Sequence, residues 1–83
     1  NKGEEEMNLK EGKNEGTYIV KAIEIEQNLE RRLEALGLTE GSSILVLNND
    51  KNGALTVKFR GTRFAMGRRI AEHIYVEEVS VNE

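Results

Sequence analysis

The apolar residues of this chain fall in short runs, and turn-forming residues separate most of these runs. The longest apolar run is Ile44–Leu47, and the densest turn signal, at residues 48–53, follows it directly. Asn, Asp and Gly tolerate the backbone angles of tight turns, so each such cluster ends a strand or a helix. The pattern predicts many short elements. It predicts no membrane span, which would need roughly 20 apolar residues in a row.

Strand patterns occupy five of the segments between the turns. Alternating apolar residues predict an inward face for Leu55, Val57 and Phe59, and they place Phe64 and Met66 together on the next strand. The Ile44–Leu47 run is continuous, as in a strand buried on both faces, and the turn after it predicts a β-hairpin. The predicted strands are Tyr18–Glu26, Ser43–Leu47, Leu55–Phe59, Thr62–Met66 and His73–Val79.

A helix is predicted between the first two strands, because Leu29, Leu33 and Leu36 follow helical spacing and should pack together. Asn28 precedes them as the N-cap candidate. At the other end, Gly37 should stop the helix in the left-handed region, followed by Leu38 in the apolar position of a Schellman motif.

The order of elements predicts the fold class. A single helical turn at residues 67–71 precedes the last strand, so the order is strand, helix, three strands, helical turn, strand. Such a chain is mainly β, and five short strands can close, or nearly close, into a small barrel with one short helix. Residues 7–83 are predicted to form this domain. Residues 1–6 are predicted to be a disordered extension or an expression remnant.

Composition excludes several function classes. His73 is the only histidine and cysteine is absent, so no metal site of the usual kind is predicted, and Met66 is predicted to be core. With one histidine and one aspartate, Asp50, the chain cannot form a plausible Ser-His-Asp triad for hydrolysis. It also has no glycine-rich loop of the P-loop type for binding phosphate. We therefore predict neither an enzyme nor a cofactor site. The net charge of −3 argues against nonspecific nucleic-acid binding. A weak cation site at Glu4–Glu6 is less favoured than a solvated tail.

Charge is nevertheless uneven along the chain. Residues 1–40 carry ten acids and six bases, whereas residues 58–69 contain five bases and no acid. We predict that these bases form a docking surface for an acidic partner or anionic lipid head groups. The alternative is a solvated face neutralised by Glu30, Glu34 or Glu40. The five bases are Lys58, Arg60, Arg63, Arg68 and Arg69.

A long, ordered string of motifs resembles a known family. Residues 32–41 read RLEALGLTEG, which is similar to the RL-x-x-LGL-x-x-G signature of the FeoA family. Val57–Gly61, then Phe64–Gly67 and Ala71–Val76 resemble the end of the family's pattern. Leu9 and Gly12 stand where the family has its opening Leu and Gly. The resemblance covers roughly residues 9–77.

The resemblance implies a fold and a role. The fold is an SH3-like barrel in the cytoplasm, a location that the absence of cysteine also fits. The role is that of an accessory protein that binds the membrane GTPase-permease (FeoB) of bacterial ferrous iron uptake and modulates its activity or assembly. The alternative is a metal-responsive module like those fused to iron-dependent transcriptional regulators, although the chain resembles the free-standing form. A third hypothesis is weak self-association through the edge of the Ile44–Leu47 strand.

Overall fold

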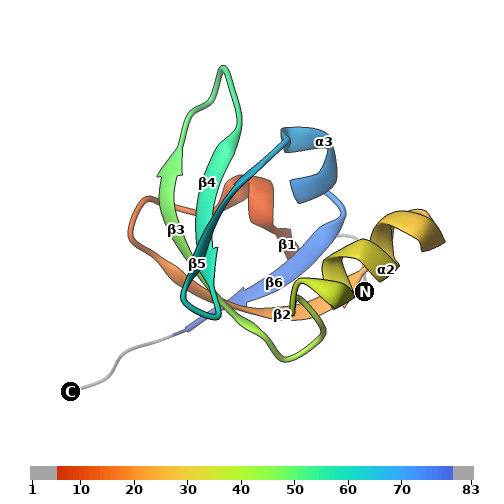
Figure 1. Cartoon of the computed structure of the whole chain (residues 1–83). Coiled ribbons are helices and arrows are strands. Elements are labelled where there is room, and N and C mark those ends of the chain that lie inside the picture. The colour runs from red at the N-terminus through yellow and green to blue at the C-terminus, as the bar shows by residue number, and fades with distance from the viewer. Residues whose placement is uncertain (1–5, 80–83) are drawn as a thin grey trace.

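The computed structural model describes residues 6–79 as a small mainly β fold (Figure 1). Nearly all of the predicted extension, and two of the three glutamates of the predicted weak cation site, lie outside these residues. Among residues 6–79, none of the helices combines the length and the hydrophobicity of a membrane span. In chain order the elements are β1 (Met7–Asn8), η1 (Leu9–Glu11), β2 (Thr17–Ile23), α2 (Gln27–Ala35), β3 (Ser43–Asn49), β4 (Leu55–Phe59), β5 (Thr62–Met66), α3 (Arg68–Ala71) and β6 (Ile74–Glu78).

The six strands form one antiparallel sheet in the order β1-β6-β2-β3-β4-β5. The sheet coils into a barrel but remains open, because β1 and β5 are its two edges and are not paired with each other. The mainly β prediction is therefore confirmed. The prediction that Ile44–Leu47 forms a sheet edge is wrong, because β3 is paired with β2 on one side and β4 on the other.

The core is apolar and continuous. Strand alternation buries Leu55, Val57 and Phe59 on one face of β4, as predicted, and Met66 joins them at 5% exposure. Tyr18 is also fully buried, and its hydroxyl accepts a hydrogen bond from the Lys13 amide at 2.8 Å. The other buried members are Leu9, Val20, Leu33, Leu38, Ile44, Val46, Ala71, Ile74 and Val76.

Helix α2 differs from its prediction at both ends. It begins at Gln27 with Glu26 as N-cap, so Asn28 lies inside the first turn and the N-cap prediction is wrong. The Glu30 amide donates to the Glu26 carbonyl, so the first helical turn already begins at Glu26, two residues before Asn28. At the other end, Gly37 has φ +102° and ends the helix as predicted.

The end of α2 is a Schellman motif. The Leu38 amide donates to the Leu33 carbonyl, and the Gly37 amide donates to the Glu34 carbonyl, both at 2.9 Å. This reversal brings Leu38 into the core and leaves Leu36 at 48% exposure, so the prediction that Leu36 packs with the other leucines is wrong.

Candidate docking site

The β4–β5 hairpin presents the clustered bases that the sequence indicated. Its two-residue turn has φ 53° at Arg60 and φ 78° at Gly61, the signs of a type I′ turn, which matches the twist of the strands. Lys58 and Arg63 lie directly opposite each other on the two strands. All three basic side chains are exposed, and the outer edge of β5 is unpaired.

Arg60 reaches back from this turn to the end of helix α2. Its side chain lies so close to the Gly37 backbone that a Cβ at position 37 would collide with the Arg60 Cδ, and would come within 2.7 Å of Nε. A guanidinium at the C-terminal end of a helix is favoured by the partial negative charge of the last carbonyls. The contact therefore joins the hairpin to the helix.

An apolar hollow of about 140 Å³ lies beside the hairpin. Phe64 is half-buried there and stacks on Phe59, with ring centroids 4.6 Å apart and an angle of 12° between the rings. Leu36 stands at the rim and is the one large hydrophobic side chain that is exposed in the described chain. Strand β5 and both helices contribute to the walls, which consist of Leu33, Leu36, Phe59, Phe64, Ala65, Met66, Gly67 and Ile70.

We use the name docking face for Lys58, Arg60 and Arg63 together with Leu36 and Phe64. Within residues 6–79, none of the three bases lies within 4.0 Å of a carboxylate. The glutamates considered as neutralising partners, Glu30, Glu34 and Glu40, thus form no ion pair with them. The docking face combines net positive charge, apolar surface and an open strand edge.

The two remaining bases of the predicted arc lie elsewhere. Arg68 is held by oxygens: Nη1 donates to Asn49 Oδ1 at 2.8 Å and to the Asp50 carbonyl at 2.9 Å. Arg69 lines a different hollow with His73 and the acidic residues Glu24, Glu26 and Glu72. The structure therefore brings three of the five bases into one face.

His73 is half-exposed, and its Nε2 lies 3.8 Å from Glu72 Oε2. Among residues 6–79, no group of three or more His, Cys, Asp or Glu side chains is placed to hold a metal ion.

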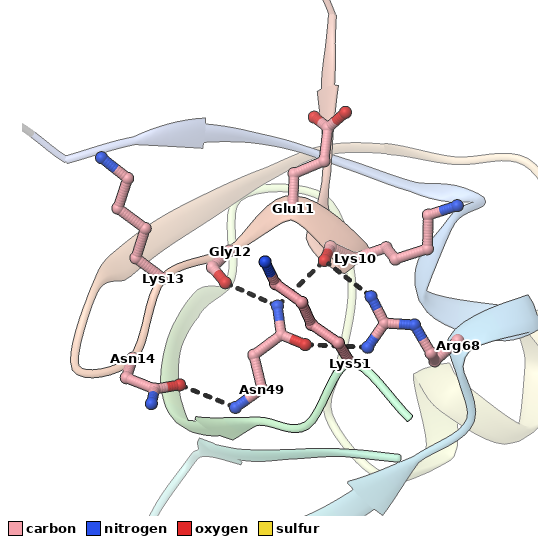
Figure 2. Close-up of a pocket in the computed structure, with 8 residues that line it drawn as sticks. All are labelled: Lys10, Glu11, Gly12, Lys13, Asn14, Asn49, Lys51 and Arg68. Carbon is pink, nitrogen blue, oxygen red and sulfur yellow. Dashed lines mark hydrogen bonds between the residues drawn. The ribbon is translucent and has the colours of Figure 1, made fainter. Parts of the chain in front are cut away.

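Sequence reasoning missed a second positively charged region. Residues of η1 and the following loop meet the β3–β4 turn and α3 around a hollow of about 590 Å³ (Figure 2). The signal for this region in the sequence is weak, because its lysines are spread over some forty positions and each alone has the pattern of an ordinary surface residue. The lining residues are Lys10, Glu11, Gly12, Lys13, Asn14, Asn49, Lys51 and Arg68.

Comparison with known proteins decides the family. The chain matches the FeoA domain over residues 7–78. It belongs to the FeoA family. A protein of Methanocaldococcus jannaschii named "Putative Fe(2+) transport protein A" is 35% identical over 60 residues, 72% of each chain. The solution structure of the FeoA protein from Chlorobium tepidum superimposes with a TM-score of 0.83 at 32% identity, covering 93% of this chain and 74% of that one.

The same fold occurs inside larger regulators. The manganese regulator SloR matches with a TM-score of 0.74 at 26% identity, over 87% of this chain but only 34% of the regulator. The FeoA-family chain thus has an SH3-like fold that also occurs as one part of a metal-dependent regulator.

Proposed function

We propose that this FeoA-family protein is a cytoplasmic accessory protein of ferrous iron uptake. In this role it binds the membrane GTPase-permease of the FeoB type and modulates its activity or assembly. Family membership and the name of the M. jannaschii relative support the link to iron transport. The docking face is the observation that carries the binding role, because it offers a partner three kinds of contact in one place.

Each contact has its own physical basis. The outer edge of β5 has unpaired backbone groups, which a strand of a partner can join by β-augmentation. The hollow next to Leu36 and Phe64 is small enough to accept a single apolar side chain of that strand. Lys58, Arg60 and Arg63 surround this edge with positive charge, which steers an acidic partner and raises its association rate. We therefore infer a partner segment that is extended, acidic and carries one apolar anchor.

A charge reversal tests this role. Arg63→Glu should weaken binding to the purified GTPase domain of the partner about five-fold or more, and Arg60→Glu with Arg63→Glu should weaken it further. The matched control is Lys21→Glu, which changes the charge equally at an exposed position of β2, where Lys21 contacts Glu77 at 3.2 Å. Isothermal titration calorimetry measures the affinity of all three variants for the GTPase domain. If the Arg63→Glu and Lys21→Glu variants bind the GTPase domain with equal affinity, the docking face is not the binding surface.

Catalysis has no part in this proposal. The single histidine faces solvent beside Glu72, and Asp50 lies in the β3–β4 turn, where its Oδ1 accepts the Asn52 amide at 3.0 Å. The modulation of a GTPase would instead require contacts that differ between the nucleotide states of the partner.

A second candidate is a metal-responsive regulatory module, which the similarity to SloR favours. Calorimetric titration of the isolated protein with ferrous iron or zinc separates the two. Stoichiometric binding at micromolar concentration would support the regulatory module. No heat of binding, together with binding to the GTPase domain, would support the accessory role.

A further inference from the structure

The hollow in Figure 2 gathers positive charge in an acidic protein. Four cations and one carboxylate line it, a formal charge of +3, while the whole chain carries −3. Clustered like charges repel each other, so the cluster is unfavourable unless a ligand or a nearby acid offsets it. In residues 6–79 only one of the four cations has an ion pair, from Lys10 Nζ to Glu72 Oε1 at 3.3 Å.

The floor of the hollow is built around Asn49. Its Nδ2 donates to the carbonyls of Lys10 at 2.9 Å and Gly12 at 2.7 Å, and its backbone amide donates to Asn14 Oδ1 at 2.7 Å. Its Oδ1 accepts from Arg68. These bonds, drawn as dashed lines in Figure 2, fix the η1–β2 loop against the β3–β4 turn. The floor of the site is therefore preorganised, and a ligand would have to order only the lysine side chains around it.

The donors that remain free define the ligand chemistry. The planar fork of Arg68, which suits a carboxylate or a phosphate, is already engaged by three oxygens of the protein. The side-chain ammonium groups of Lys13 and Lys51 have no bonding partner in the described chain, and Asn14 Nδ2 is also free there, because the Asn14 side chain bonds only through Oδ1. Ammonium groups act as point charges, so they favour the anion of higher charge, and a phosphate monoester carries about −1.5 to −2 at pH 7 against −1 for a carboxylate.

We propose that this hollow binds a small soluble phosphate ester. In this arrangement Lys13 and Lys51 contact the phosphate oxygens, Asn14 Nδ2 donates to a third, and the fixed charge of Arg68 lies behind them. In Figure 2 Lys51 extends across the mouth, while the Lys13 side chain extends outward from the rim and would turn inward to reach the ligand. The space exceeds that of one phosphate and falls in the range of small-molecule pockets, so an organic group fits beside the phosphate. A concave site with its charge at the rim suits a discrete ligand better than a flat membrane surface.

Titration with pyrophosphate at constant ionic strength tests the assignment, with two-dimensional amide NMR spectra as the readout. We expect saturable shifts at the amides of Gly12, Asn14, Asn49 and Lys51. The double variant Lys13→Gln with Lys51→Gln should weaken binding about ten-fold or more, because each lost contact is a charge-assisted hydrogen bond. Both side chains are exposed, so the variant should fold, and its own spectrum shows whether it does.

The matched control removes the same charge elsewhere. Lys21→Gln with Arg31→Gln should leave the affinity for pyrophosphate unchanged, since both side chains are exposed and neither residue lines the hollow. Non-saturating shifts, or an equal loss of affinity in the two double variants, would overturn the site. Equal affinity for citrate would overturn the choice of phosphate over carboxylate. Sedimentation with phosphatidylglycerol vesicles that depends on Lys13 and Lys51, without pyrophosphate binding, would overturn a soluble ligand.

Discussion

Arg60 and Gly37 each hold an unusual backbone conformation, and the two residues lie in contact. Arg60 has φ 53° in the hairpin turn, where glycine, asparagine or aspartate is the usual choice. Its side chain extends over the backbone of Gly37, whose φ of +102° ends helix α2. The sequence predicted the left-handed glycine from its place after the leucines. The sequence could not predict the contact between Gly37 and Arg60, because these residues are 23 positions apart in the chain.

Replacing Gly37 by alanine should therefore cost more than the backbone strain alone. Gly37→Ala introduces a Cβ at positive φ and also collides with Arg60, whereas Gly41→Ala introduces one at φ +91° with no atom within 4 Å. We expect a loss of about 1–2 kcal/mol in the free energy of unfolding for Gly41→Ala. For Gly37→Ala the loss should be larger by about 0.3–1 kcal/mol, because the exposed Arg60 side chain has to leave the helix end to make room for the Cβ. Urea denaturation measures both, and equal losses would show that Arg60 yields without cost.

At the scale of elements, periodic patterns were predictable and irregular ones were not. The cores of β2 to β6 follow from alternation and turn residues, and α2 follows from leucine spacing. The two residues of β1 and the three of η1 carry no period, although Asn8 and Glu11 form a capping box around η1. The docking face was predictable only in part. The sequence groups Lys58, Arg60 and Arg63 because they lie on one predicted hairpin. It does not predict the exposure of Leu36, which depends on the Schellman motif at the end of α2.

Asn49 connects elements that the sequence showed only as turns. Asn49→Ala removes two bonds to the η1–β2 loop and one to Arg68, and should lower the free energy of unfolding by about 2–4 kcal/mol. Asn48→Ala is the matched control, because Asn48 is exposed and makes no side-chain hydrogen bond in the described structure. Chemical denaturation of the two variants compares them. A loss below about 1 kcal/mol for Asn49→Ala would mean that water replaces these bonds.

At the scale of the whole molecule, the open barrel leaves two strand edges of different character. β1 is two residues long, so it offers little to a partner, whereas β5 has five residues and an apolar hollow beside it. Edges of this kind promote unwanted pairing between copies unless charge protects them. Lys58 and Arg63 supply this charge, although like charges opposite each other weaken the hairpin. The same two residues thus serve partner selection and protection against self-association in the proposed role.

Removing this charge should have opposite effects on stability and on solution behaviour. Lys58→Thr with Arg63→Thr replaces a repulsive pair by a favourable one, and should raise the free energy of unfolding by about 0.5 kcal/mol. It should also let β5 edges pair, so that sedimentation velocity shows dimers or larger species that grow with concentration. Lys13→Thr with Lys21→Thr lowers the net charge equally, away from β5, and should stay at the mass of the unmodified protein. If both double variants self-associate alike, net charge and not the β5 edge controls solubility. If neither does, the charge of the hairpin is not what keeps the β5 edge unpaired.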